Sequence, residues 1–112
     1  MPRAIWNGAV IAESSDTIKI EGRHYFPPSS LNDEYLRRSD AKSTCYWKGV
    51  ARYLDVVVDG EVNEEAGWTY PKPSEAAAPI RDHVAFWRGV RIEALEDEPK
   101  PLLYRMKEAV GL

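Results

Sequence analysis

The chain has 112 residues, of which 44% are hydrophobic and 29% are charged, and its formal net charge is −3. This length fits one domain, residues 1–112, with a single hydrophobic core. The apolar runs are far shorter than the roughly 20 residues of a membrane-spanning helix, and the negative net charge does not favour nucleic acid as a partner. The single cysteine and the lack of a secretion signal predict a cytoplasmic protein.

The first 28 residues predict a β-meander. Residues 6–13 form the first strand region, with a turn or bulge at Gly8, where glycine tolerates unusual backbone angles. Residues 17–21 alternate apolar and polar side chains, as a half-buried strand does. A reversal at Gly22 leads into the aromatic strand 24–26, which two prolines terminate because they lack the N–H groups that strand pairing needs.

The central part of the chain predicts a short helix followed by a long strand region. Residues 29–38 begin with a capping serine, carry acidic residues early and end in arginines, which favours a short internal helix. Residues 44–58 then alternate as one long bent strand or as two strands with Gly49 at the break. The even-numbered residues from Val50 onward share one face and the odd-numbered residues share the other. Asp59 and Gly60 predict a tight hairpin turn.

The remaining pattern predicts further strands at 67–70, 83–87 and 90–95, with one helical turn at 74–78. Apolar residues at helical spacing predict a C-terminal helix at about 100–111. The fold that we expect is therefore mainly β, with two packed antiparallel sheets, one short internal helix and a C-terminal helix.

Residues 44–53 are the best candidate for a site, because they combine aromatic side chains, cations and a glycine within a strand pattern. The four tryptophans of the chain lie on different predicted strands or strand ends, where their rings can pack as core or line a partly open cleft. We expect a small-molecule ligand to be held by a set of aromatic and basic side chains, namely Trp47, Lys48, Arg52, Tyr53, Trp68 and Tyr70.

Lys48 and Arg52 are four positions apart, so on one strand they would share a face and could bind an anionic group together. The alternative is that both side chains extend from a sheet surface and pair with nearby acids. Glu13 is the carboxylate that we expect nearest to them, because it falls within a predicted strand, where a charge must be paired or exposed.

Catalytic roles are also conceivable for a few of these residues. Lys48 would stabilise negative charge, while Glu13 or Cys45 would act as base or nucleophile; a buried structural role is the alternative for the thiol. His24 and His83 form no recognised metal spacing with Cys45, so we expect neither a metal nor another cofactor. Motifs of phosphate-binding loops, dinucleotide-binding turns and serine hydrolases are absent from the sequence.

Several motifs occur in an order that resembles a known family. They lie between Trp6 and about Ile92 and read Trp6-x-Gly8-x-Val10-Ile11-Ala12-Glu13-Ser14, Glu21-Gly22-x-x-Tyr25-Phe26-Pro27, Ser39 with Thr44-Cys45-x-Trp47-Lys48-Gly49-x-Ala51-x-Tyr53, Trp68-x-Tyr70-x-x-Pro73 and His83-Val84-Ala85-Phe86. This pattern is similar to domain of unknown function 427, a family catalogued as nucleotidyltransferase-like. The resemblance implies a small mainly β core over about residues 6–92, with a C-terminal helical extension, and a topology similar to the Mss4-like or β-tent folds, whose relatives include zinc-binding and methionine sulfoxide reductase domains.

The sequence departs from this pattern at two points. Tyr46 follows Cys45, where the family usually has proline, and the single cysteine cannot supply the paired cysteines that hold zinc in many β-tent relatives. The residues that nucleotidyltransferase chemistry requires are also missing from the sequence. A nucleotidyltransferase needs closely spaced carboxylates, typically Asp-x-Asp after a Gly-Ser turn, to hold magnesium, and the chain contains neither pattern.

Three functions follow in order of preference. The first is binding of a small ligand, anionic or nucleotide-like, in an aromatic-lined cleft. The alternative is a nucleotidyltransferase-like or other small-molecule enzyme, and a further alternative is a structural homodimer that pairs through exposed sheet edges.

Overall fold

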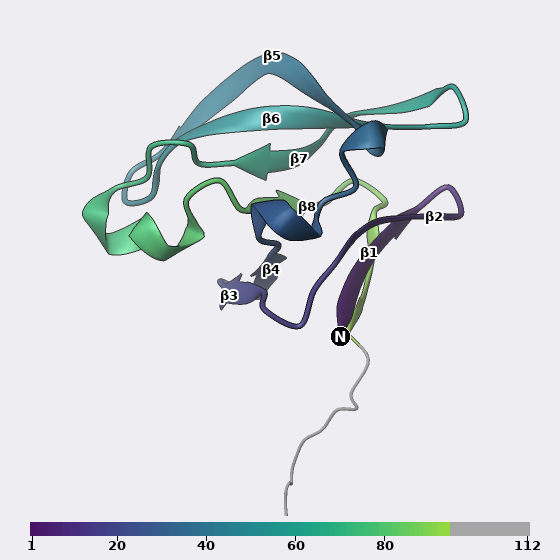
Figure 1. The fold of residues 1–112 in the computed structure, drawn as a ribbon. Coiled ribbons are helices and arrows are strands. Elements are labelled where there is room, and N and C mark those ends of the chain that lie inside the picture. Colours follow the sequence, from purple (N-terminus) through teal and green to yellow (C-terminus); the bar gives the residue numbers. More distant parts are fainter. Residues whose placement is uncertain (95–112) are drawn as a thin grey trace, which may run out of the picture.

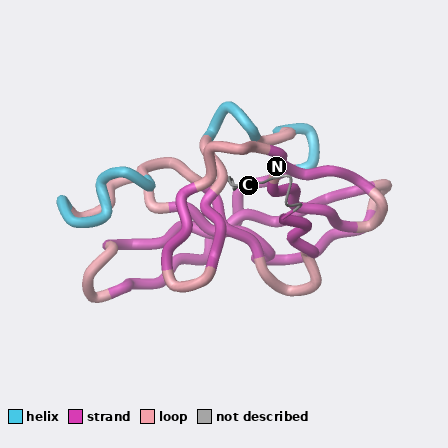
Figure 2. Tube along the Cα trace, turned by 90° about the horizontal axis from the view of Figure 1, so that it is seen from below, coloured by secondary structure: helices cyan, strands magenta, loops and turns pink. Residues whose placement is uncertain are grey.

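The computed structural model of the protein describes residues 1–94 and is mainly β, as predicted. Within these residues the strands form three antiparallel sheets instead of the expected two, and every helical segment is a short 3₁₀ turn (Figure 1). Seen from below, strands make up most of the molecule and the helical turns lie at its margins (Figure 2). The C-terminal helix expected at 100–111 lies outside the described residues, and the β-tent topology stays a prediction.

The first sheet joins the two ends of the described chain. Its strands are β1 (Pro2–Trp6), β2 (Ala9–Glu13) and β9 (Arg91–Ala94), in the order β2-β1-β9. The predicted turn at Gly8 is confirmed: Asn7 and Gly8 both have positive φ, at 50° and 80°, as a two-residue hairpin turn requires.

The largest sheet has the order β5-β6-β7-β8 and supplies both faces discussed below. Its strands are β5 (Leu36–Cys45), β6 (Gly49–Val58), β7 (Glu61–Thr69) and β8 (Val84–Phe86). Of the two alternatives for residues 44–58, the structure shows two strands, with a hairpin turn between β5 and β6 before Gly49. Asp59 with Gly60 forms the predicted turn before β7. β5 arches away from β6 where the register shifts between Arg38 and Lys42 (Figure 1).

The third sheet is the hairpin of β3 (Ile18–Ile20) and β4 (Arg23–Tyr25). The residue after β4, Phe26, exchanges two backbone hydrogen bonds with Val84 of β8, at N···O distances of 2.8 and 2.9 Å. The hairpin therefore lies beside the edge of the large sheet while keeping its own register. Alternation of side chains assigns the faces of a strand but not its partners. It therefore could not predict that this hairpin forms a third sheet, joined to the large sheet by one bridge.

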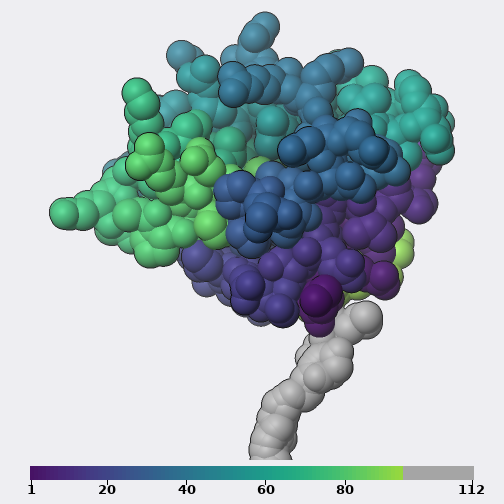
Figure 3. Space-filling view, viewed as in Figure 1, coloured from purple at the N-terminus to yellow at the C-terminus, as the bar shows by residue number. Residues whose placement is uncertain are grey.

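The internal helix predicted at 29–38 is wrong. The chain forms two 3₁₀ turns, Pro28–Ser30 and Asp33–Tyr35, and then enters β5 directly. Long-range pairing overrides the local helix signal, because Leu36 pairs with Val56 of β6 and the backbone N–H of Asn32 donates to the Ile11 carbonyl oxygen. Figure 3 shows this blue segment filling the space between the large sheet and the purple N-terminal strands. The helical turn predicted at 74–78 is present as a 3₁₀ helix, Glu75–Ile80.

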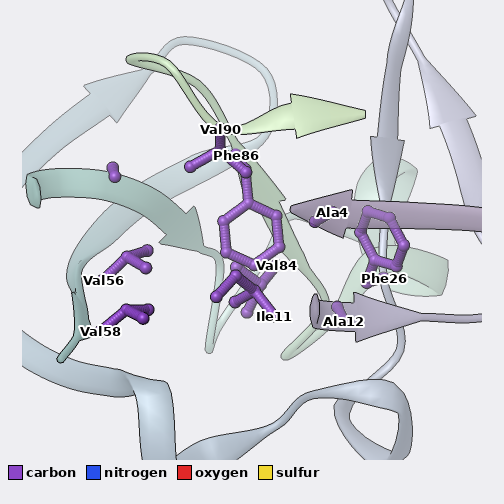
Figure 4. Packing of buried hydrophobic residues seen from close by; sticks show 10 residues of the cluster. Ala4, Ile11, Ala12, Phe26, Val56, Val58, Val84, Phe86 and Val90 are labelled. Atoms are coloured by element: carbon purple, nitrogen blue, oxygen red, sulfur yellow. The ribbon is translucent and has the colours of Figure 1, made fainter. Parts of the chain in front are cut away.

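The alternation predicted along β6 is confirmed and divides the hydrophobic residues into two clusters. The larger cluster contains Val56 and Val58 of β6, Ile11 of β2, Phe26, which follows β4, and further residues of the N-terminal and large sheets (Figure 4). The smaller cluster lies on the other face of the large sheet and contains Tyr25, Ala51, Tyr70, Ala77, Ile80 and Ala85. Burial of these side chains is the main stabilising contribution that the sheets supply.

A bulge in β7 depends on one buried carboxylate. Leu54 pairs with Gly67 and Val56 with Asn63, so several residues of β7 oppose Asp55 alone. Asp55 is 8% exposed, and its Oδ1 accepts a hydrogen bond of 2.9 Å from the backbone N–H of Glu65. Arg37 donates to its other oxygen at 3.1 Å. The bulge thus has its central N–H group satisfied by a side chain instead of by the partner strand.

We expect Asp55→Ala to destabilise the protein by about 1–3 kcal/mol, because it leaves the Glu65 N–H without an acceptor in a partly buried position. Urea unfolding followed by tryptophan fluorescence measures this loss. Arg37→Ala is the matched control, since it removes an ion pair whose arginine side chain is 58% exposed and should cost about 1 kcal/mol or less. Equal losses in the two variants would contradict the role given to the Glu65 hydrogen bond.

Candidate functional site

A cleft of about 230 Å³ opens on the face of the large sheet that carries the odd-numbered residues of β6. Aromatic side chains and two cations dominate its lining, which consists of Ile20, Glu21, Arg23, Tyr25, Lys48, Tyr53, Trp68, Tyr70 and Trp87. These residues come from β3, β4, β6, β7 and the turns beside them. We call this hollow the aromatic cleft.

The wall of the aromatic cleft is built by strand register. Tyr53 of β6 lies directly opposite Trp68 of β7, so both side chains project from the same face. Trp87 follows β8 and contacts both rings, with centroid distances of 5.4 Å to Trp68 and 6.5 Å to Tyr53. The bulge of β7 holds Trp87 in place, because its indole N–H donates to the Glu65 carbonyl oxygen at 2.6 Å.

The hairpin of β3 and β4 closes another side of the cleft. Tyr25 packs edge-on against Trp68 and accepts a hydrogen bond of 3.3 Å from the Trp68 indole N–H. Arg23 places its guanidinium 5.3 Å from the centre of the Trp68 ring and donates to the Phe86 carbonyl oxygen at 3.0 Å. A cation held over an aromatic face is favourably placed, and Arg23 also lines the cleft.

Lys48 is carried by the turn between β5 and β6, which a neighbouring loop fixes. The Ser74 backbone N–H donates to the Lys48 carbonyl oxygen at 3.0 Å, and the Ser74 hydroxyl donates to the Trp47 carbonyl oxygen at 2.6 Å. Gly49 ends the turn with a φ of +118°, and a side chain there would approach the Lys72 carbonyl oxygen to 3.2 Å. Glycine is therefore required for the turn to sit this close to the loop.

The ammonium group of Lys48 is the most unusual charge of the cleft, because the residue is only 5% exposed. Its Nζ lies 2.7 Å from the Oε1 of Glu21, 4.6 Å from the centre of the Trp47 ring and 5.9 Å from that of Tyr70. The Glu21 side chain is 62% exposed, so the pair joins a buried cation to a carboxylate at the surface. A buried charge needs such partners to offset its loss of hydration.

The pKa values around Lys48 reflect this arrangement. Burial acts to lower the pKa of Lys48, but the Glu21 hydrogen bond and the neighbouring Tyr70 and Cys45 outweigh it, so the pKa is raised. The hydrogen bond and charge of Lys48 lower the pKa of Glu21. Burial, with Tyr25 nearby, raises the pKa of Tyr70 to about 12. Near neutral pH the cleft therefore holds an ammonium, a carboxylate and a neutral phenol.

The structure brings together four of the six ligand-binding residues expected from the sequence, Lys48, Tyr53, Trp68 and Tyr70. Trp47 stacks on the Lys48 ammonium from outside the lining. Arg52 does not share a face with Lys48, which is an expectation that fails because Lys48 lies in the turn and not on the strand. Arg52 points to the opposite face of the sheet, into a different hollow.

Glu13 is not the carboxylate that accompanies Lys48. It lies on β2, opposite Arg3 of β1, and its Oε2 is 3.9 Å from the Arg3 Nε. Glu21 takes the expected position instead, from the turn between β3 and β4. Sequence reasoning also missed Arg23 and Tyr25, and it considered Trp87 only as one of four tryptophans that could line a cleft. The available signal was the hairpin pattern around Gly22, which places a carboxylate, a guanidinium and an aromatic ring within a few residues.

Cys45 lies at the end of β5 and packs against the smaller cluster instead of lining the cleft. The backbone N–H groups of Trp47 and Lys48 and the Lys48 ammonium stabilise its thiolate, so the pKa of Cys45 is lowered although partial burial opposes the shift. Tyr46, which follows Cys45, is 96% exposed and belongs neither to the smaller cluster nor to the lining of the aromatic cleft.

Within residues 1–94, no group of three or more His, Cys, Asp and Glu side chains is arranged to hold a metal ion. In the same residues no helix has the length and apolar character that crossing a bilayer requires.

We expect Lys48→Met to raise the pKa of Cys45, because it removes the ammonium that favours the thiolate. The rate of alkylation by iodoacetamide, measured against pH, reports this pKa directly, since the chain has one cysteine. The midpoint should lie below the ordinary thiol value in the wild-type protein and move to higher pH in the variant. Lys19→Met is the control for loss of a positive charge elsewhere; an equal shift in both variants would contradict a local effect.

Comparison with known proteins agrees with the motifs in the sequence. No curated protein matches the chain. The sequence model of one family, described as Domain of unknown function (DUF427), matches residues 2–98, which includes the span from Trp6 to Ile92 that carries the motifs. Because this match covers most of the 112 residues, the chain belongs to the DUF427 family.

Proposed function

We propose that the protein binds a small organic anion with a flat, aromatic body in the aromatic cleft. The observation that carries the proposal is the Lys48 ammonium, which is buried at the cleft and neutralised by an exposed carboxylate on a hairpin turn. A cation that is already desolvated interacts more strongly with an incoming anion than one in bulk water does.

The size and lining of the cleft define the ligand. Its 230 Å³ is below the roughly 300–1,000 Å³ of pockets for drug-sized molecules, so it fits a single ring system better than a large ligand. Trp68, Trp87 and Tyr53 offer ring surfaces for stacking, while Lys48 and Arg23 offer positive charge. An aromatic carboxylate matches both features.

The Glu21 carboxylate marks where the anionic group of the ligand would sit. Glu21 reaches Lys48 from a tight turn in which both Glu21 and Gly22 have positive φ, and its side chain is largely exposed. While Glu21 contacts Lys48, the formal charges of Lys48, Arg23 and Glu21 sum to +1. If the Glu21 side chain turns away, Lys48 and Arg23 present a charge of +2 to the ligand. A ligand carboxylate would thus replace Glu21 at the ammonium.

Binding, rather than catalysis, is the function that this geometry supports. The two residues considered as base or nucleophile, Glu13 and Cys45, do not line the aromatic cleft. A ligand held between the rings and Lys48 would therefore meet a cation and a phenol, Tyr70, whose raised pKa keeps it protonated.

Benzoate and indole-3-acetate are suitable probes, with quenching of tryptophan fluorescence as the measurement. Lys48→Met should weaken binding at least tenfold, which corresponds to about 1.4 kcal/mol, because it removes the buried counter-charge. Glu21→Gln should strengthen binding several-fold, because it removes the competing carboxylate but keeps the shape of the turn.

Benzamide, the neutral counterpart of benzoate, controls for ring stacking alone. Equal affinity for benzoate and benzamide would refute the role of the ammonium. Weaker binding of benzoate by Glu21→Gln would show that Glu21 supports the ligand instead of competing with it, and would overturn this part of the proposal.

A further inference from the structure

A second and larger hollow, of about 630 Å³, lies on the opposite face of the large sheet. It is lined by Arg38 of β5, Arg52 of β6, Thr69 of β7 and Lys72 of the following loop, with Asp82 as the one acid among its lining residues. We call it the basic hollow. Its charges sum to +2, in a chain whose net charge is −3.

Strand register places a fourth cation at its margin. Lys42 of β5 lies directly opposite Arg52 of β6, and Arg52 lies directly opposite Thr69 of β7, so the three side chains form one row across the same face. Like charges placed directly opposite each other destabilise a sheet. Lys42 and Arg52 repel each other at the exposed end of β6, and a neutral residue at either position would make the sheet more stable.

These cations also lack the carboxylate partners that several other cations of the described chain have. Within residues 1–94, Arg3, Arg37, Lys48, Arg88 and Arg91 each form an ion pair with a carboxylate. In that same part of the chain no ion pair or side-chain hydrogen bond involves Arg38, Lys42, Arg52 or Lys72. The Oγ1 of Thr69, in the row with Arg52, is buried and has no hydrogen-bond partner either.

We infer that the basic hollow is a binding site for a phosphate monoester of a small organic molecule. Two arginines and a lysine line it, and the planar fork of arginine matches the oxygens of a phosphate group. The excess of cations over Asp82 suits a dianion better than a monoanion. Val50, Leu54 and Pro71 provide an apolar wall that can receive the organic part of the ligand. Tyr53 lines both hollows, but the cations of the basic hollow do not line the aromatic cleft, because adjacent residues of β6 direct their side chains to opposite faces.

Monobutyl phosphate is a direct probe, because it carries the phosphate group and an aliphatic chain but no aromatic ring for the other face. Titration at a constant ionic strength of about 0.15 M, followed by ¹⁵N NMR, should give saturable shifts of the Lys42, Arg52 and Thr69 amides. Its affinity should exceed that of inorganic phosphate. Shifts confined to the indole N–H signals of Trp68 and Trp87 would place the ligand in the aromatic cleft and overturn the inference, as would equal affinity for inorganic phosphate.

Arg52→Gln should weaken binding of monobutyl phosphate at least tenfold and should also raise the melting temperature of the ligand-free protein, because the repulsion with Lys42 is lost. A purely structural role for Arg52 predicts the opposite change in melting temperature. Arg52→Lys should retain part of the affinity. If Arg52→Gln does not fold, Lys42→Gln provides the same two readouts with a smaller loss of affinity.

Lys19→Gln is the matched control, since it removes an exposed positive charge on β3, outside the lining of both hollows. It should bind monobutyl phosphate as the wild-type protein does. If Lys19→Gln weakens binding as much as Arg52→Gln, or if Arg52→Gln binds as tightly as the wild-type protein, the effect is one of net charge and the site is refuted.

Discussion

The alternation of side chains along β6 is the constraint on which the rest of the structure depends. Tyr53 faces the aromatic cleft and its neighbour Arg52 faces the basic hollow, while Val56 and Val58 continue the second face into the main core. A slip of one residue in the pairing of β6 would exchange the two sets and place Arg52 beneath the rings. The bulge at Asp55 absorbs the extra residues of β7, so Tyr53 stays opposite Trp68 and the faces remain distinct.

Burial of Lys48 is a second constraint on the structure, and it depends on three segments that are distant in sequence. The turn after β5 carries the side chain, Ser74 fixes the turn, and the hairpin of β3 and β4 supplies Glu21 as counter-charge. Removing water from an ammonium is unfavourable, and the fold offsets this loss when it forms the ion pair and the ring contacts. The cation is therefore already positioned and desolvated before any ligand arrives, which reduces the loss of freedom on binding.

Local patterns in the sequence predicted the parts of the fold that depend on neighbouring residues. The turn at Asp59 and Gly60, the two faces of β6 and the break before Gly49 follow from residue type and a period of two. Partners could not be predicted in this way, because β1 pairs with β9 across almost the whole described chain. The helix expected at 29–38 failed for the same reason, since pairing of Leu36 with Val56 outweighs a local preference. In the candidate site, Lys48 and Tyr53 of the 44–53 segment line the cleft as expected, whereas Arg52 does not. Glu21 reaches the cleft from the hairpin of β3 and β4, and Trp87 reaches it from the end of β8.

The charge distribution shows that the net charge of the chain says little about the charge at one place on its surface. A value of −3 spread over the whole chain gives no reason to expect an anion site, yet register sets Lys42 opposite Arg52 and leaves both without an acid. At physiological ionic strength charges are screened over about 8 Å, so a bound anion responds to the cations that line its site and hardly to acids on distant turns. Many of the acids are committed elsewhere: Asp55 satisfies the bulge, Glu93 pairs with Arg3 and Arg91, and Glu21 covers Lys48. These acids have partners, whereas the cations that line the hollow have no carboxylate partner in the described part of the chain, so the hollow carries a local positive charge on an acidic protein.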